Sequence, residues 1–160
     1  MCNVMTKASL VIALLTAVAL PSAAADKKYA SWEGSWHLNK TETHYPAGVM
    51  VTANDLTVST DDGKTLKFSE TVTNAGQTTT QNYDGAYDGK FYDVGDGESL
   101  SYTHVSADAS KAVRHNKDGF VLERTTQVVS KDGKKLTCHV WAQRPGGKPI
   151  KFDEIFDKGE

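Results

Sequence analysis

The stretch from residue 120 to residue 143 constrains the fold more than any other part of this chain. Two runs with the composition of β-strands, residues 120–130 and 135–143, flank Lys131-Asp132-Gly133, which is typical of a tight turn between antiparallel strands. The stretch therefore predicts a β-hairpin whose two strands are joined by a short loop.

The register of this hairpin decides which side chains are buried. A three-residue loop with Gly133 in the left-handed conformation pairs Val128 with Leu136 and Arg124 with Val140. One face then carries the apolar residues Phe120, Leu122, Val128, Leu136, Val140 and Ala142, and the other carries Glu123, Gln127, Lys135, Thr137, His139 and Gln143. A two-residue loop would shift the register by one and mix the two faces, which the burial of one face disfavours.

Most of the remaining chain reads as further units of this kind. The same loop geometry around Gly63 joins residues 49–60 to residues 64–73, and it pairs Val58 with Leu66, Leu56 with Phe68, and Asn54 with Glu70. Further strand-like runs are residues 34–39, 77–83, 90–93, 100–104, 111–115 and 150–156. No run after residue 25 shows the hydrophobic period of a helix.

About eight to ten short strands at this regular spacing predict an all-β domain. A continuous antiparallel meander exposes two unpaired edges unless the sheet closes on itself. We therefore predict an up-and-down β-barrel, with a two-sheet sandwich as the alternative.

The amino end has the pattern of a secretory signal peptide. Lys7 precedes an apolar run from Leu10 to Leu20, and small residues lead to a cleavage site after Ala25. The apolar run is too short to span a bilayer, and no longer apolar run follows. We therefore expect residues 1–25 to be removed, residues 26–33 to form a loose lead-in, residues 34–160 to form a single β-barrel domain, and the mature protein to be periplasmic or secreted.

Charge and cysteine content narrow the range of partners. The chain has a formal net charge of −2 without a run of basic residues, and loss of Lys7 makes the mature chain one unit more negative. This argues against nucleic acid or an anionic membrane as the main partner. Cys138 is left as a single cysteine, so we expect no internal disulfide and a buried thiol that packs as a small hydrophobic group.

Three short motifs carry a resemblance to a known family. They are Gly34-x-Trp36-x-Leu38-Asn39, Tyr83-Asp84-Gly85, and the run from Val129 to Thr137. Together with the meander of hairpins, these motifs resemble the lipocalin-like (calycin) barrels, and small secreted bacterial proteins of unknown function in particular. The resemblance implies that Trp36 plugs one end of the barrel and that the other end admits a ligand.

The chain departs from the lipocalin pattern at its carboxyl end. Lipocalins usually place an arginine of the final strand against the tryptophan, and here the predicted final strand offers only Lys151. Lipocalins also carry a helix after the barrel, for which this chain has no room. The ligand cavity is therefore an expectation from the resemblance alone.

Arg124 is the strongest candidate for a ligand-binding residue. The predicted register aims Arg124 into the barrel, and the predicted faces place Asn54 and Glu70 inside as well. A buried guanidinium is costly unless it is paired. Two readings stay open: Glu70 pairs with Arg124 as part of the structure, or Arg124 anchors an anionic group of a ligand through two parallel hydrogen bonds.

Aromatic residues make up the rest of the candidate site. Phe68, Tyr102, Phe120 and Phe152 would line a pocket in a ligand-binding barrel and would be ordinary core in a packed one. Trp141 falls on the predicted outer face, where it either marks a contact surface or is covered by the lead-in.

The sequence contains no established motif for metal binding or catalysis. The five histidines lack the spacing of a metal site, and the acidic residues between Asp84 and Glu98 fit no calcium-binding loop. Nucleophile-elbow, phosphate-loop and zinc-protease motifs are absent from it. We therefore expect no metal and no cofactor, and we assign no catalytic residue.

Three functions from different classes remain. The first is an exported envelope protein that binds a small, partly apolar ligand inside the barrel, with Arg124 as its polar anchor and an anionic ligand as one option. The second is a protein-interaction or inhibitor module with a packed interior, acting through Trp141 and the segment from Asp84 to Glu98. The third is a hydrolytic or isomerising enzyme, which no motif supports. An open interior would favour the first function, and a filled interior the second.

Overall fold

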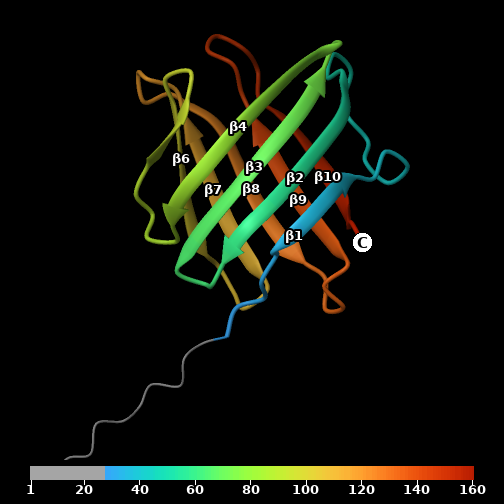
Figure 1. Cartoon of the computed structure of the whole chain (residues 1–160). Coiled ribbons are helices and arrows are strands. Elements are labelled where there is room, and N and C mark those ends of the chain that lie inside the picture. Colours follow the sequence, from blue (N-terminus) through green and yellow to red (C-terminus); the bar gives the residue numbers. More distant parts are fainter. Residues whose placement is uncertain (1–27) are drawn as a thin grey trace, which may run out of the picture.

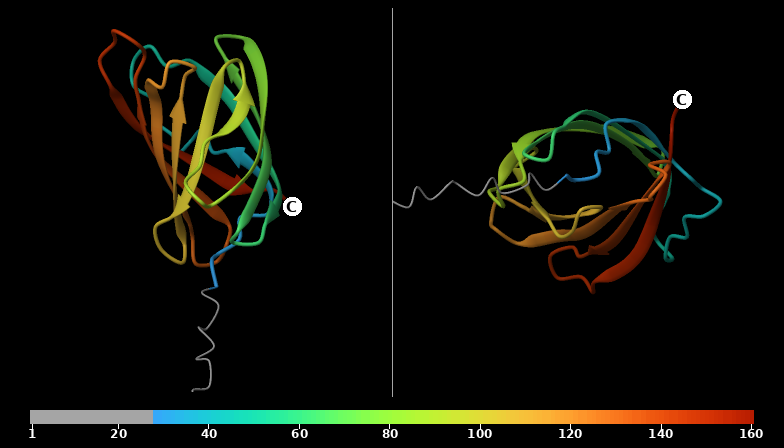
Figure 2. Two further views of the ribbon diagram at one scale, coloured as in Figure 1. Left: turned by 90° about the vertical axis from the view of Figure 1, so that its left-hand side faces the viewer. Right: turned by 90° about the horizontal axis from the view of Figure 1, so that it is seen from below.

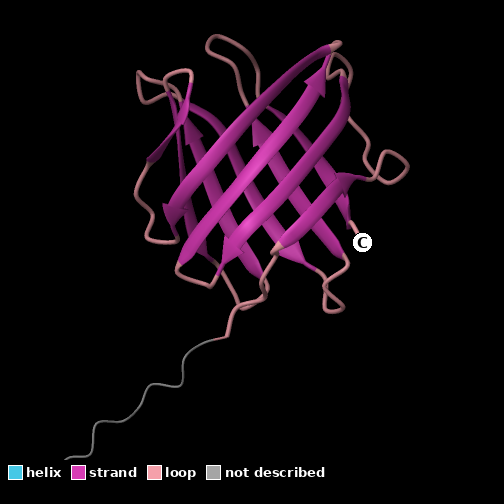
Figure 3. Ribbon diagram, viewed as in Figure 1, coloured by secondary structure: helices cyan, strands magenta, loops and turns pink. Residues whose placement is uncertain are grey.

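The computed structural model describes residues 28–160, and the signal peptide expected at residues 1–25 lies outside the described residues. The described chain consists of strands and loops, without a helix between residues 28 and 160 (Figure 1, Figure 3). Its strands are β1 (Gly34–Leu38), β2 (Val51–Asp61), β3 (Thr65–Asn74), β4 (Gln77–Ala86), β5 (Tyr92–Gly95), β6 (Glu98–His104), β7 (Ala109–His115), β8 (Val121–Val129), β9 (Lys135–Ala142) and β10 (Ile150–Lys158). The prediction of an all-β domain with eight to ten strands is confirmed.

All of these strands belong to one antiparallel sheet with the order β4-β3-β2-β1-β10-β9-β8-β7-β6-β5. The first and last strands, β1 and β10, therefore pair with each other in the middle of the sheet. The sheet curls until its edge strands β4 and β5 come together, and the view along the axis in Figure 2 shows the resulting ring of strands. The predicted up-and-down barrel is confirmed, with one seam between β4 and β5 that lacks a continuous ladder of backbone hydrogen bonds.

The pairing of β2 with β3 differs from the predicted register by two residues. Leu56 pairs with Glu70, and an irregularity between Val58 and Thr60 takes up an extra residue. A shift of two positions leaves every side chain on its predicted face. Asn54, Leu56 and Val58 are accordingly buried, as expected.

The predicted register of the β8–β9 hairpin is wrong by one residue. Val129, rather than Val128, pairs with Leu136. The backbone N–H of Ser130 donates to the carbonyl of Lys135 at 2.9 Å, so the loop between the strands has four residues, 131–134, instead of three.

Side-chain hydrogen bonds in the loop explain the extra residue. The Ser130 hydroxyl donates to the Asp132 carboxylate at 2.6 Å and accepts from the backbone N–H of Lys135 at 2.9 Å. The Asp132 carboxylate also accepts from the backbone N–H of Lys134 at 3.1 Å. These bonds hold the wider turn, with Gly133 in the left-handed conformation at a φ of 68°.

A shift of one residue exchanges the two faces of β8. Thr125 and Gln127 point inward and are buried, whereas Arg124 is exposed and Val128 is half-buried on the outside. The polar side chains are tolerated inside because they find partners: Gln127 accepts a hydrogen bond from the Ser110 hydroxyl at 3.3 Å.

Trp32 and Trp36 pack together where the described chain enters the barrel. Both are buried, and the indole N–H of Trp36 donates to the carbonyl of Trp32 at 2.7 Å. The backbone N–H of Trp32 and the hydroxyl of Tyr87 both donate to the Asp61 carboxylate, and the indole N–H of Trp32 donates to the Tyr87 oxygen. Trp32 therefore belongs to the core of the barrel.

The final strand carries a cation against Trp36. Lys158 pairs directly with Trp36, and its Nζ lies 5.1 Å from the centroid of the indole ring. Lys151, the only basic residue of the predicted final strand, is exposed on the outside. The predicted end of the strand at Phe156 is two residues short, because β10 continues to Lys158.

Aromatic rings fill the seam beside β4. The rings of Tyr83 and Tyr92 meet edge to face with their centroids 5.7 Å apart. A Cβ atom at Gly85 would lie 2.6 Å from the ring of Tyr83 and 2.7 Å from the ring of Tyr92. Glycine at this position therefore permits the close approach of the rings that packs the seam.

We expect Gly85→Ala to lower the free energy of unfolding by about 1–3 kcal/mol, because the added methyl group displaces both rings. Urea denaturation measures the change. Thr79→Val, at an exposed position of the same strand, is the control and should stay within about 0.5 kcal/mol of the wild type. Equal stability of the two variants would contradict the role of Gly85.

Candidate functional site in the barrel interior

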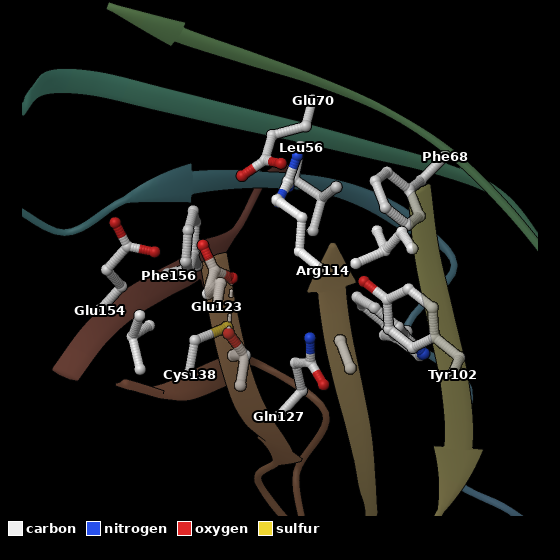
Figure 4. Close-up of a pocket in the computed structure, with 15 residues that line it drawn as sticks. Leu56, Phe68, Glu70, Tyr102, Arg114, Glu123, Gln127, Cys138, Glu154 and Phe156 are labelled. Atoms are coloured by element: carbon white, nitrogen blue, oxygen red, sulfur yellow. Dashed lines mark hydrogen bonds between the residues drawn. The ribbon is translucent and has the colours of Figure 1, made fainter. Parts of the chain in front are cut away.

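A small cavity lies inside the barrel. Its volume is about 50 Å³, roughly the space of one or two water molecules. Side chains from many strands line it, among them Leu56, Phe68, Glu70, Tyr102, Arg114, Glu123, Gln127, Cys138, Glu154 and Phe156 (Figure 4). Sites for drug-sized molecules enclose roughly 300–1,000 Å³. The interior is therefore mostly packed, and only a small group fits into it without rearrangement.

A chain of hydrogen bonds crosses the interior from β2 to β7. Asn54 Nδ2 donates to Glu70 Oε1 at 3.0 Å, and the amide of Gln81 donates to the other oxygen of the same carboxylate. Arg114 Nη1 donates to Gln81 Oε1 at 2.6 Å and to Glu98 Oε2 at 3.1 Å. Because Gln81 lies on β4 and Arg114 on β7, these bonds bridge the seam on its inner side.

Arg114 is surrounded by acidic groups. Burial alone would lower the pKa of Arg114, but the nearby carboxylates of Glu123, Glu70 and Glu98 together raise it. In Figure 4 the guanidinium of Arg114 points toward Glu70. The cavity is lined by three carboxyl groups, those of Glu70, Glu123 and Glu154, and by this one guanidinium. The interior therefore carries more acidic than basic groups.

Glu154 is held by the phenol of Tyr45. The Tyr45 hydroxyl donates to Glu154 Oε1 at 2.6 Å, and its ring meets Phe152 edge to face with the centroids 5.3 Å apart. Burial raises the pKa of Glu154 to about 7, although the hydrogen bond from Tyr45 acts to lower it. The charges of Glu70 and Glu123 contribute to the same rise, so Glu154 exchanges its proton near neutral pH.

Tyr45 comes from the loop between β1 and β2. Because β1 pairs only with residues 156–158 of β10, a loop covers the earlier part of β10. The backbone N–H of Asn39 donates to the carbonyl of Ile155 at 2.7 Å, and the hydroxyl of Thr43 accepts from the N–H of Ile155 at 2.9 Å. A loop rather than a strand thus completes the barrel wall at Tyr45.

Cys138 and Tyr102 line the cavity in their neutral forms. Burial raises the pKa of the Cys138 thiol, and nearby carboxylates, Glu154 first among them, raise it further. Burial likewise raises the pKa of the Tyr102 hydroxyl. A thiol that stays protonated is a poor nucleophile. Of these three side chains, Glu154 is the one able to accept and release a proton near neutral pH.

Several of the sequence-predicted site residues meet in the interior. Phe68, Glu70 and Tyr102 line the cavity. Asn54 is buried beside them and donates to Glu70, while its own Oδ1 is a buried acceptor without a hydrogen-bond partner among residues 28–160. Trp36 is fully buried.

The other predicted residues lie elsewhere. Arg124 is exposed, and its guanidinium lies over the ring of Trp141, 4.8 Å from the centroid. The predicted inward orientation of Arg124 is therefore wrong, because the β8 register is shifted by one residue. Phe120 precedes β8 and is absent from the cavity lining, and Phe152 packs against Tyr45.

Three important interior residues were outside the prediction: Arg114, Glu154 and Tyr45. Glu154 had a usable signal, since it shares the alternation of Phe152 and Phe156 on the predicted inner face. The register of the hairpin containing Arg114 could not be settled from the sequence. No local pattern places Tyr45 against β10, because that contact joins residues far apart in the chain.

Residues 28–160 contain no group of three or more His, Cys, Asp or Glu side chains placed to hold a metal ion. Among these residues there is also no helix with the length and apolar character needed to cross a membrane.

In comparisons with known proteins, neither a protein-family model nor a curated protein matches this chain. The order of the strands and the near closure of the sheet are compatible with a lipocalin-like barrel. The interpretation of the site therefore depends on its own geometry.

The raised pKa of Glu154 predicts a pH-dependent stability. The folded protein binds this proton more tightly than the unfolded chain, so the contribution to stability is full below about pH 4.5 and is lost as the pH rises through about 7. Glu154→Gln removes this dependence. We expect its free energy of unfolding, relative to the wild type, to rise by up to about 3 kcal/mol between pH 4.5 and pH 8. A constant difference in urea denaturation across this range would contradict the assignment.

Tyr45→Phe should raise the pH at which Glu154 loses its proton. Without the phenol hydrogen bond the carboxylate loses a stabilising donor, so the pKa of Glu154 should rise above its wild-type value of about 7. The ¹³C shift of the Glu154 carboxyl carbon, followed by NMR against pH, measures it. Tyr92→Phe, whose hydroxyl bonds to Asp88, serves as the control and should leave the titration in place.

Proposed function

We propose that this protein is an exported, lipocalin-like carrier that binds a small, partly apolar ligand through a positively charged group of that ligand. The observation that carries the proposal is the charge of the cavity lining, with three carboxyl groups and one guanidinium. The signal-peptide pattern at the amino end supports export.

The charge balance favours a cationic ligand over an anionic one. The guanidinium of Arg114 already donates to Gln81 and Glu98. The carboxyl groups of Glu123 and Glu154 also line the cavity, and the hydrogen bonds they accept come from the neutral hydroxyls of Thr125 and Tyr45. An ammonium or guanidinium group of a ligand would add charge-assisted hydrogen bonds. The expected anionic ligand depended on Arg124 as its anchor, and Arg124 is exposed on the outer face.

The size of the cavity limits what it can enclose. A volume of about 50 Å³ accepts the charged group but not the rest of a larger ligand. The apolar remainder would leave through the wall at Tyr45, since a loop is displaced more readily than a paired strand. Phe156 and Val140 supply apolar contacts along the way.

The mostly packed interior also supports the second function, a protein-interaction module. In that reading the polar network is structural, and binding takes place on the outer face. The two functions can coexist in one barrel because they use opposite faces of the same strands.

A direct test compares hexylamine with hexanoate, which share a chain length and differ in charge. We expect the amine to bind and the acid not to bind, as followed by the fluorescence of the tryptophans, of which Trp32 lines the cavity. Binding of the amine should tighten as the pH rises through about 7, because Glu154 becomes charged. Glu154→Gln should weaken amine binding at pH 8 by about tenfold.

The control is Asp153→Asn, which removes a carboxylate from the neighbouring position of the same strand. Asp153 is exposed and points outward, so its loss should leave amine binding unchanged. Equal affinity for amine and acid, no affinity for either, or equal sensitivity to both substitutions would overturn the proposal.

A further inference from the structure

The outer face of β7–β10 carries a basic patch around Trp141. Cross-strand pairing aligns Val113, Arg124, Trp141 and Lys151 in one row, and Lys111, Thr126, His139 and Asp153 in the next. We use the term basic patch for Lys111, Arg124, Trp141 and Lys151 with the His139–Asp153 pair. A shallow groove of about 430 Å³ runs between these side chains.

The arginine at the centre of the basic patch is preorganised. Its guanidinium lies over the indole of Trp141, 4.8 Å from the ring centroid. A cation–π contact of this kind restricts the rotamers of Arg124, and a guanidinium held in this way can still donate its N–H groups to an acceptor. A fixed guanidinium fork matches a carboxylate with two parallel hydrogen bonds.

The charge of the basic patch contrasts with that of the whole chain. Lys111, Arg124 and Lys151 contribute three cations, in a protein with a formal net charge of −2. The one carboxylate of the patch, on Asp153, is bonded to His139 Nδ1 at 2.8 Å. The face is therefore complementary to an acidic partner.

The geometry also distinguishes between classes of acidic partner. Sugars and nucleic acid bases stack on bare aromatic rings, whereas the ring of Trp141 is covered by Arg124. A membrane surface favours protruding apolar side chains, and Trp141 is half-buried in the wall. Protein interfaces have tryptophan and arginine at their centre and charged residues at their rim, which is the arrangement seen here.

We propose that the basic patch docks an acidic segment of another protein. Arg124 grips a carboxylate of that segment, Trp141 holds the guanidinium in place, and Lys111 and Lys151 attract flanking acids. This docking surface is independent of the barrel interior and of any ligand bound there.

The test is an NMR titration of the ¹⁵N-labelled protein with a decaglutamate peptide. We expect shifts of the Trp141 indole N–H and of the amides of Arg124 and Lys151. Arg124→Lys keeps the charge but removes the fork and the stacking, and it should raise the dissociation constant about tenfold. Lys67→Ala is the matched control on β3, where Lys67 is paired with Asp84, and should leave the dissociation constant unchanged.

Several outcomes would overturn the proposal. If the wild type and Arg124→Lys bind the peptide with equal affinity, binding depends on general charge attraction and not on the guanidinium fork. Tighter binding of a heparin fragment of equal charge, or of phosphatidylglycerol vesicles, would assign the basic patch to a polysaccharide or to a membrane. A dimer in sedimentation that Arg124→Lys dissociates would make a second copy of this chain the partner. An unchanged Trp141 signal up to millimolar peptide would exclude docking of acidic segments.

Discussion

The pairing of Arg114 is the interaction on which the interior of this barrel depends. A buried guanidinium without partners would be strongly destabilising. Its two hydrogen-bond acceptors, Gln81 and Glu98, lie on β4 and β6, on opposite sides of the seam. The contacts that neutralise Arg114 are therefore also the contacts that hold together the one place where the sheet lacks a continuous backbone ladder.

Other carboxyl groups that line the cavity receive no hydrogen bond from Arg114. Glu154 is the clearest case, since burial raises its pKa to about 7 and its hydrogen-bond donor is the phenol of a loop residue, Tyr45. A carboxyl group with so perturbed a pKa, beside a cavity, is typical of functional sites. The residue that supplies this donor lies in a loop that completes the wall without strand pairing, so the acidic group lies beside the part of the wall where we propose that a ligand enters.

The sequence predicted what local patterns determine. Alternating residues and turn signals located the strands, and the meander followed from short connections. The inward and outward faces of β2 and β3 were predicted correctly, although the pairing of the two strands is shifted by two residues. Two features were missed because they depend on contacts between residues far apart in the chain. Tyr45 meets Glu154 across 109 positions of the chain, and β10 extends to Lys158 because that residue pairs with Trp36 in β1.

The β8–β9 hairpin shows how much depends on one residue of loop length. Counting apolar residues favoured a three-residue loop, which would bury Arg124 and expose Glu123. The hydrogen bonds of Ser130 and Asp132 hold a four-residue loop instead, and this exchanges the two side chains between the faces. The predicted register would have placed a second arginine in an interior that already holds Arg114, and it would have removed the guanidinium from Trp141. Hydrogen bonding within the turn, rather than apolar burial, thus decides that β8 supplies Glu123 to the interior and Arg124 to the basic patch.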